Sequence, residues 1–283
     1  MDGVIIINKQ KNFTSHDVVN VIRKKLNIKK VGHTGTLDPN ATGVLPILVG
    51  KATKISKYLI EHDKTYIATI KLGEKTDTGD NEGQVIEEKL VPTDLKEEDI
   101  NNVLQIFLGK QKQVPPMYSA IKINGKKLYE YAREGKEVKL EAREIEIYKI
   151  QLLEYKNSKI KFEVECSKGT YIRTLCEDIA KKLGTVGYME ELQRTKVNNF
   201  KIGDSVLLDD ITLENVEENL IKIEEVFKEK DKIELDNKKL ELFLNGVKLT
   251  YDLPKDIYRI YNNKQFIGIG IVENKLLKRD IVI

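Results

Sequence analysis

Residues 32–46, GHTGTLDPNATGVLP, constrain the backbone more than any other part of the sequence. The glycines and the proline after Asp38 favour a fixed, non-helical backbone. Such a loop can hold one carboxylate at the bottom of a cleft, but an aspartate before a proline is more often a simple turn residue. A phosphate-accepting aspartate is a third interpretation, although the usual partners for Mg²⁺ and phosphate are not evident. The spacing alone leaves the choice open.

Strand and helix patterns alternate on both sides of this loop. Apolar runs and period-two alternation predict strands at 3–8, 64–72, 84–90, 143–155, 158–167 and near 190–198. Helices are predicted at 15–26, capped by Ser15, at 52–62, 93–107 and 171–183, and within the acidic stretch 204–231. Beyond that stretch, short strands with turns at Asn262–Asn263 and near Asn274 predict a small β domain.

The composition argues against several classes of protein. No stretch approaches the roughly 20 apolar residues of a membrane span, and the first apolar run is too short for a signal peptide. We therefore expect a cytoplasmic protein. Cys166 and Cys176 have no zinc-site spacing, and three scattered histidines offer no ligand set, so reduced thiols are expected. Neither GxGxxG after a strand nor GxxxxGK[ST] occurs, so neither common nucleotide-phosphate site is predicted.

The net charge is only +3, but it is unevenly distributed. Residues 1–75 hold 13 basic and 6 acidic side chains, and residues 108–149 hold 10 basic and 6 acidic ones. Residues 76–105 and 204–242 are acidic. Two basic blocks separated by acidic ones suggest a face that binds a polyanion. Solvated helix faces in a lysine-rich chain would give the same counts, so charge alone does not decide.

Several runs together resemble the tRNA pseudouridine synthases of the TruB family. The segment GHTGTLDPNATGVLPILVGKATKI resembles the catalytic motif of that family. Four further segments match it in the expected order: GVIIINKQKNFTSHDVV, KTYIATIKLGEKTDTGDNEG, PPMYSAIKINGKKLYEYAREG and CSKGTYIRTLCEDIAKKLG. The resemblance covers about residues 3–200. The C-terminal tail loosely resembles the small RNA-binding PUA-type domain of the family.

The resemblance implies a fold and a partner. The expected fold is α+β, with a pseudouridine synthase domain over 1–230 built on a mixed, mostly antiparallel sheet with flanking helices and a central cleft. An RNA-gripping insertion is expected at about 111–142, and a small β-rich PUA-like domain at 231–283. The implied partner is the T stem-loop of tRNA, whose position 55 would be modified. We expect a monomer that needs no obligatory protein partner and does not bind membranes.

The resemblance also implies the chemistry and the catalytic residues. Pseudouridylation breaks the N1–C1′ bond, turns the base and joins C5 to C1′, so this isomerisation requires no cofactor and no metal. Asp38 matches the catalytic aspartate, which attacks C1′ or stabilises charge there. Arg173 matches an arginine that pairs with it and favours its ionised form. Tyr66 matches a tyrosine that stacks on the target base and can relay a proton.

Four further residues are expected to bind the substrate on the same grounds. His33 matches a histidine that packs into the T loop while the uridine is flipped out. Tyr171 is similar to a tyrosine that forms hydrogen bonds near the catalytic pair. Lys9 aligns with a basic residue near the site, although Gln10 stands where the family commonly has proline. Arg194 lies where the family carries basic and apolar residues below the nucleotide pocket.

Two alternatives to this function remain at this stage. The chain could bind and refold tRNA through the same cleft without turnover. It could also be a guide-RNA-dependent pseudouridine synthase, although such relatives need protein partners and usually longer flanking regions. The combination of Asp38, Tyr66 and Arg173 favours an enzyme, because binding alone would not need it. The complete insertion from Pro115 onward favours recognition of RNA without a guide.

Overall fold

A computed structural model describes residues 1–60, 62–119, 121–136 and 138–283. The strands are β1 (Gly3–Lys9), β2 (Val31–His33), β3 (Thr42–Val49), β4 (Lys64–Leu72), β5 (Glu74–Thr76), β6 (Val85–Glu88), β7 (Gly109–Gln113), β8 (Lys122–Ile123), β9 (Lys126–Lys127), β10 (Arg143–Lys156), β11 (Lys159–Cys166), β12 (Gly187–Val197), β13 (Phe200–Lys201), β14 (Val206–Leu207), β15 (Ile221–Lys222), β16 (Lys232–Glu234), β17 (Leu249–Thr250), β18 (Asp256–Asn262), β19 (Gln265–Glu273) and β20 (Leu276–Val282). The helices are α1 (Ser15–Leu26), α2 (Ser56–Ile60), α3 (Glu97–Ile106), α4 (Leu128–Arg133), α5 (Ile172–Lys182), α6 (Ile223–Val226) and α7 (Asn237–Leu244), with 3₁₀ turns η1 (Gly50–Ile55) and η2 (Ile202–Asp204).

One long mixed sheet forms the body of the molecule. Its main order is β14-β1-β3-β12-β4-β11-β10-β7. Only the β1/β14 and β3/β12 pairs are parallel, and the other pairs are antiparallel. Strand β12 joins the two halves, because it pairs with β3 on one side and β4 on the other. The predicted α+β class with a mostly antiparallel sheet is confirmed.

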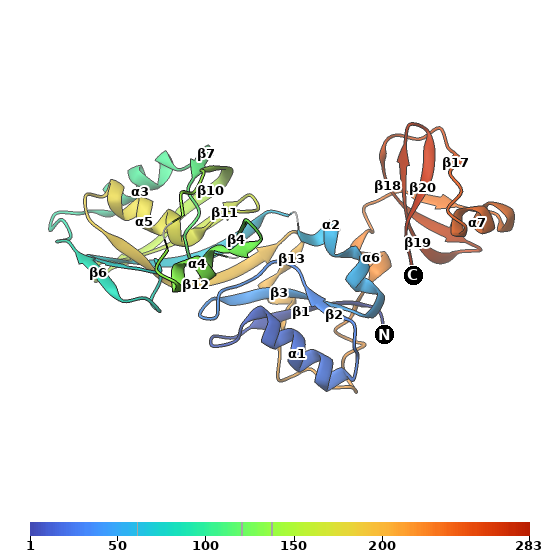
Figure 1. Cartoon of the computed structure of the whole chain (residues 1–283), viewed down its shortest axis with the longest axis horizontal. Coiled ribbons are helices and arrows are strands. Elements are labelled where there is room, and N and C mark those ends of the chain that lie inside the picture. The colour runs from blue at the N-terminus through green and yellow to red at the C-terminus, as the bar shows by residue number, and fades with distance from the viewer. Residues whose placement is uncertain (61, 120, 137) are drawn as a thin grey trace.

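Helices cover the two halves of this sheet at different places. Figure 1 shows α3 and α5 over the end formed by β4, β11 and β10, and α1 against the end formed by β1 and β3. The run GVIIIN is continuously apolar because β1 is buried on both faces. Ile5 and Ile7 belong to the core beneath α1, whereas Val4 and Ile6 belong to a second core that includes residues of the C-terminal sheet.

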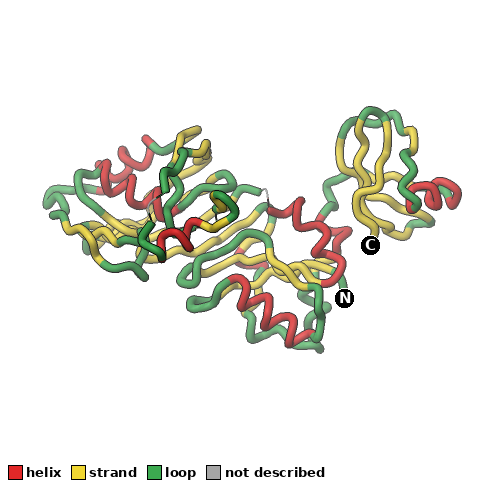
Figure 2. Tube along the Cα trace, in the orientation of Figure 1, coloured by secondary structure: helices red, strands yellow, loops and turns green. Residues whose placement is uncertain are grey.

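A second, five-stranded sheet lies at the C-terminal end, in the order β16-β18-β19-β20-β17. Figures 1 and 2 show it as a separate unit beyond α2 and α6, with α7 at its outer side. It contacts the first unit through Ile269 and Ile281 and through an ion pair of 2.5 Å between Lys57 and Asp280. Its first strand begins at Lys232, one residue after the start of the predicted domain.

Several local predictions differ from the structure. Thr14, not Ser15, caps α1, since its side chain accepts from Asp17 N. The segment predicted as helix 52–62 is the 3₁₀ turn η1 followed by the short helix α2, and residue 61 lies outside the described residues. The acidic stretch 204–231 contains the four-residue helix α6 among turns, a much shorter helix than expected. Helix α7 was not predicted.

The junction of the two half-sheets requires a glycine at position 43. There β3 runs beside β12, and Gly43 has a φ of +106°. A Cβ atom at this position would lie 2.1 Å from the carbonyl oxygen of Arg194, which is backbone and cannot move aside. Any side chain here therefore pushes the two halves of the sheet apart.

We predict that Gly43→Ala lowers the free energy of unfolding by about 3 kcal/mol or more, because clash and backbone strain add. Urea denaturation measures this change in the free energy of unfolding. The matched control is Gly203→Ala, where the added Cβ meets nothing within 4 Å; it should change stability by less than ~0.5 kcal/mol. Equal effects of the two substitutions would contradict this description of the junction.

Candidate active site

Asp38 lies on the loop that joins β2 to β3. This loop is tied to the elements beneath it. Ser15 Oγ of α1 accepts a hydrogen bond of 2.9 Å from Leu37 N, directly before Asp38. The loop also closes on itself, as Ala41 N donates to Asp38 O at 3.1 Å. The non-helical loop predicted from its glycines and Pro39 is confirmed, and its backbone holds Asp38 in one place.

Two buried cations lie behind this loop. Lys9 and Arg194 each have 0% relative exposure. Lys9 Nζ donates to three carbonyl oxygens, including Pro39 O at 3.0 Å. The guanidinium of Arg194 donates to carbonyl oxygens of β3 and of the loop. Neither side chain is exposed in this structure, so direct substrate binding by Lys9 and Arg194 stays a prediction.

Arg173, in the first turn of α5, faces Asp38. Its Nη2 lies 3.3 Å from Asp38 Oδ2, and its Nη1 lies 3.6 Å from Asp80 Oδ2. Two backbone carbonyls complete its partners, with Nη1 donating to Thr78 O at 3.2 Å and Nη2 to Tyr118 O at 2.7 Å. The side chain of Arg173 is only 8% exposed. Two carboxylates and two backbone carbonyls therefore hold this buried guanidinium in place.

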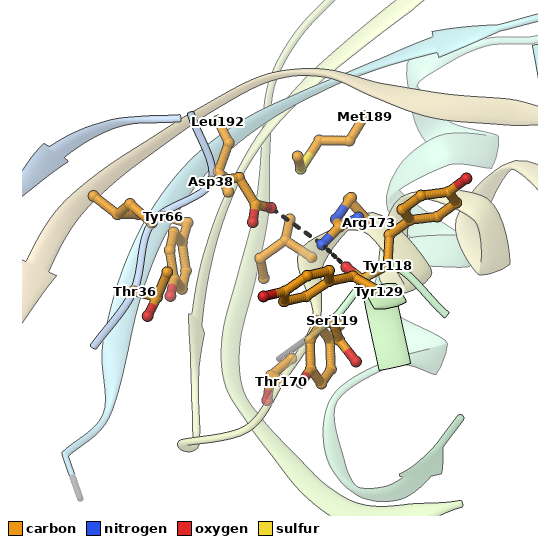
Figure 3. A pocket seen from close by; sticks show the side chains of 13 residues that line it. Thr36, Asp38, Tyr66, Tyr118, Ser119, Tyr129, Thr170, Arg173, Met189 and Leu192 are labelled. Atoms are coloured by element: carbon orange, nitrogen blue, oxygen red, sulfur yellow. Dashed lines mark hydrogen bonds and ion pairs between the residues drawn. The ribbon is translucent and has the colours of Figure 1, made fainter. Parts of the chain in front are cut away.

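A cleft of about 430 Å³ opens over this pair. Figure 3 shows Asp38 and Arg173 facing each other in it, with the ring of Tyr66 beside Asp38. Tyr118, Ser119 and Tyr129 contribute the wall that belongs to the predicted insertion, two of whose residues, 120 and 137, lie outside the described part. The aromatic rings lie around one carboxylate. Such a site suits a ligand that carries a flat polar ring next to an anionic group.

Burial and the neighbouring charges shift the pKa of Asp38 in opposite directions. Burial raises the pKa of Asp38 above its ordinary value, the positive charges of Arg173 and Lys9 oppose this rise, and the negative charge of Asp80 adds to it. Its side chain keeps 39% of its exposure, so the carboxylate still reaches the cleft. Burial also raises the pKa of Tyr66 to about 12, although the charge of Arg194 opposes that rise. Tyr66 is therefore a neutral phenol near pH 7.

His33 and Tyr171 lie differently with respect to the cleft. His33 ends β2 at the edge of the loop, half-buried and outside the residues that line the cleft. Burial, followed by the charges of Arg194 and His16, lowers its pKa. Tyr171 lines the cleft just before α5 and is held by its backbone, which donates to Gln113 Oε1 and accepts from Gln113 Nε2. The substrate contacts expected of both side chains stay predictions.

Asp80 is the member of the site that its sequence context does not reveal. It stands in DTGDNEG, a run typical of a turn, but the structure places it in an isolated β-bridge with Met189, between the bends at 77–79 and the turn at 81–82. Its side chain is nevertheless only 10% exposed and is fixed by a hydrogen bond of 2.6 Å from Thr78 Oγ1. The signal that could have found it is the density of acidic residues in a segment that resembles the family motif.

Other site types receive no support from the described residues. In these ranges no group of three or more His, Cys, Asp or Glu side chains is placed to hold a metal ion. Cys166 and Cys176 are buried free thiols, as expected. No helix in the described part of the chain is long and apolar enough to cross a membrane. The chemistry offered by the cleft is that of one oriented carboxylate, which can attack an electrophilic carbon or stabilise positive charge there.

Comparisons with known proteins identify related chains. A model described as "TruB family pseudouridylate synthase (N terminal domain)" matches residues 23–172, and one described as "tRNA pseudouridylate synthase B C-terminal domain" matches residues 173–238. The tRNA pseudouridine synthase B of Clostridium tetani is 48% identical over 95% of both chains. That of Alkaliphilus oremlandii is 43% identical, over 97% of this chain and 94% of its own. The structure of a Cbf5-Nop10-Gar1 complex contains a chain similar at a TM-score of 0.71 and 26% identity, covering 99% of this chain and 83% of that one.

We predict that Arg173→Met raises the pKa of Asp38, because the guanidinium that lowers it is gone while Asp80 remains. A ¹³C NMR titration of the Asp38 carboxylate measures this directly. Arg259→Met removes an arginine from the C-terminal sheet and should leave the Asp38 pKa unchanged. An unaltered titration in Arg173→Met would show that the two side chains do not interact in solution.

Proposed function

The chain belongs to the TruB family of pseudouridylate synthases, and we propose that it isomerises the T-loop uridine of tRNA, position 55, to pseudouridine. Formation of pseudouridine in tRNA is the activity in the names of relatives that match nearly the full chain. The position of the uridine and the roles of individual residues go beyond these names and are proposed here. The observation that carries it is the Asp38–Arg173 pair of 3.3 Å beside the Tyr66 ring.

Asp38 is proposed to act on C1′ of the uridine. Two courses fit a single carboxylate. In one, an oxygen of Asp38 bonds to C1′ as the N1–C1′ bond breaks, and leaves when C5 attacks. In the other, the carboxylate takes the 2′ proton as the N1–C1′ bond breaks, which gives a glycal and free uracil; C5 then adds to C1′ as the proton returns to C2′. Both need the ionised carboxylate, which Arg173 favours by its charge.

Tyr66 is proposed to stack on the freed uracil while it turns. With a pKa of about 12 its hydroxyl is protonated near pH 7, so it enters the reaction as a phenol and not as a ready base. Tyr66 is largely buried but lines the cleft, so its ring can present a flat surface to the base. The final loss of the C5 proton then passes by way of this hydroxyl or a nearby water.

The target uridine is proposed to be flipped out of the folded loop, because C1′ and C5 are inaccessible inside it. The insertion at 111–142 supplies lysines for phosphates and tyrosines for stacking. Cation–π contacts join side chains within the insertion, with Lys126 over Tyr131 at 4.8 Å and Arg133 over Tyr129 at 5.4 Å. His33 is proposed to pack into the opened T loop, and the unit from residue 231 onward to act as a PUA-like RNA-binding domain.

A stand-alone enzyme is proposed in preference to a guide-dependent one. The relatives of 42–48% identity are named tRNA pseudouridine synthase B, whereas the Cbf5 likeness is 26% identical. We accordingly propose a monomer that acts on tRNA without a protein partner. Purified protein and a T stem-loop transcript should suffice for turnover.

We predict that wild-type protein releases tritium from C5-labelled uridine in a T stem-loop hairpin without added guide RNA. Asp38→Asn should still bind the hairpin but lose more than about 10³-fold in rate, since it removes the attacking group. The control Asp209→Asn changes an exposed aspartate outside the cleft and should be fully active. Normal turnover by Asp38→Asn would refute its role, while a wild type that binds but never turns over would support an RNA-folding protein.

We also predict that RNA affinity falls with salt, because the basic blocks displace counterions from the backbone. Lys122 is exposed on β8 of the insertion, so Lys122→Ala should reduce the slope of log K against log salt by about one. Lys89→Ala, in the acidic block, should leave the slope unchanged. A slope near zero for wild type, measured by filter binding, would contradict the electrostatic part of the proposal.

A further inference from the structure

Arg194 occupies the junction of the two half-sheets. On β12 it stands opposite Tyr66 of β4 on one side and beside Gly43 of β3 on the other. It is the largest side chain among those that are fully buried. Burying a guanidinium is unfavourable unless hydrogen-bond acceptors or opposite charges compensate it. The stability of the fold alone therefore does not explain why an arginine is buried at this position.

The hydrogen-bond acceptors of the Arg194 guanidinium include three carbonyl oxygens and no carboxylate, and its interaction with the Tyr66 side chain opposes the lowering of the Arg194 pKa by burial. Nε donates to Val44 O at 2.8 Å, Nη2 to Gly35 O at 3.1 Å and Nη1 to Thr36 O at 3.5 Å. Among the ion pairs found between described residues, none includes Arg194. A guanidinium suits this task, because its planar fork reaches several acceptors at once.

Two of these carbonyls belong to the loop that carries Asp38. Arg194 holds positions 35 and 36, Ser15 holds Leu37, and Lys9 holds the Pro39 carbonyl. Asp38 is therefore fixed from both sides along the backbone, while its carboxylate stays open to the cleft. At Gly35, whose φ is +78°, an added Cβ would lie 3.4 Å from Arg194 Nη1, so guanidinium and loop are closely apposed.

We propose that Arg194 is a positioning residue for the reaction: it fixes the 34–41 loop so that Asp38 meets both Arg173 and the nucleoside. It acts through Asp38 and not by touching RNA. The inference rests on the proposed function for its kinetic part. It departs from the sequence prediction of substrate binding, and the two can be separated because they affect different constants.

The kinetic test compares Arg194→Met, Arg194→Lys and Lys196→Met on the labelled hairpin. Arg194→Met should lower kcat by about 10²-fold, the cost of an angstrom-scale misplacement, and leave KM and the Kd for RNA unchanged. Arg194→Lys should keep more of kcat than Arg194→Met, because an ammonium group can still donate to some of these carbonyls. It should not reach wild type, because one ammonium cannot span all of the carbonyls that the guanidinium reaches. Lys196→Met deletes a half-exposed charge from the same strand, where it pairs with Glu165, and should match wild type.

A second readout needs no activity. Amide hydrogen exchange at Leu37 and Ala41 reports the loop, since both N–H groups are bonded within it or to Ser15. In Arg194→Lys these amides should exchange several-fold faster, while the amide of Phe162 in β11 stays as protected as in wild type. This conservative variant carries the test should Arg194→Met fail to fold, which circular dichroism will show.

Three results would overturn the proposal. A rise in KM and Kd at unchanged kcat would make Arg194 a substrate-binding residue, as its sequence context predicts. Unchanged kcat in both Arg194 variants would remove its role in the reaction. Unchanged exchange at Leu37 and Ala41 would show that the guanidinium does not hold the loop. An inactive wild type would refute the proposed function instead, and the exchange experiment would still decide whether Arg194 fixes Asp38.

Discussion

The ion pair between Asp38 and Arg173 depends on how the two halves of the main sheet are joined. Asp38 comes from the β2–β3 hairpin on one half, and Arg173 from the helix that packs on the other. Strand β12 connects the halves by pairing with β3 and β4 at once. Gly43 permits that approach, and residues from both halves of the sheet line the cleft. The position of the site is therefore a consequence of the sheet topology.

The charges around Asp38 balance two requirements. In the proposed reaction the carboxylate has to be ionised, yet it also has to lie where water can be excluded. Burial raises its pKa, and the Arg173 and Lys9 charges work against that effect. When RNA covers the cleft, the remaining exposure of Asp38 is lost and the surrounding dielectric falls, so the interaction with Arg173 gains weight. Asp80 lies on the other side of Arg173, with its Oδ2 3.6 Å from Nη1 of the guanidinium.

Local sequence patterns predicted the helices and strands in which buried residues recur at regular intervals. Strands β4, β10 and β11 and helices α1 and α5 lie close to their expected bounds, because one face of each is regularly apolar. Ser15 was predicted to cap α1, but its hydroxyl binds Leu37, a partner 22 residues away that no local pattern can identify. The burial of Lys9 and Arg194 also depends on tertiary contacts that local sequence does not show, since lysine and arginine are almost always expected at the surface. Asp80, which also pairs with Arg173, stands in a sequence run typical of a turn, where aspartate is ordinary.

We propose that formation of pseudouridine at position 55 of tRNA by this protein requires the Asp38 carboxylate. Mapping pseudouridine at nucleotide resolution in tRNA from cells that lack this gene, and from the same cells supplied with wild type or Asp38→Asn, tests it most directly. We expect position 55 to be unmodified without the gene, restored by wild type, and still unmodified with Asp38→Asn. Pseudouridine at that position in cells that carry only Asp38→Asn would contradict the account.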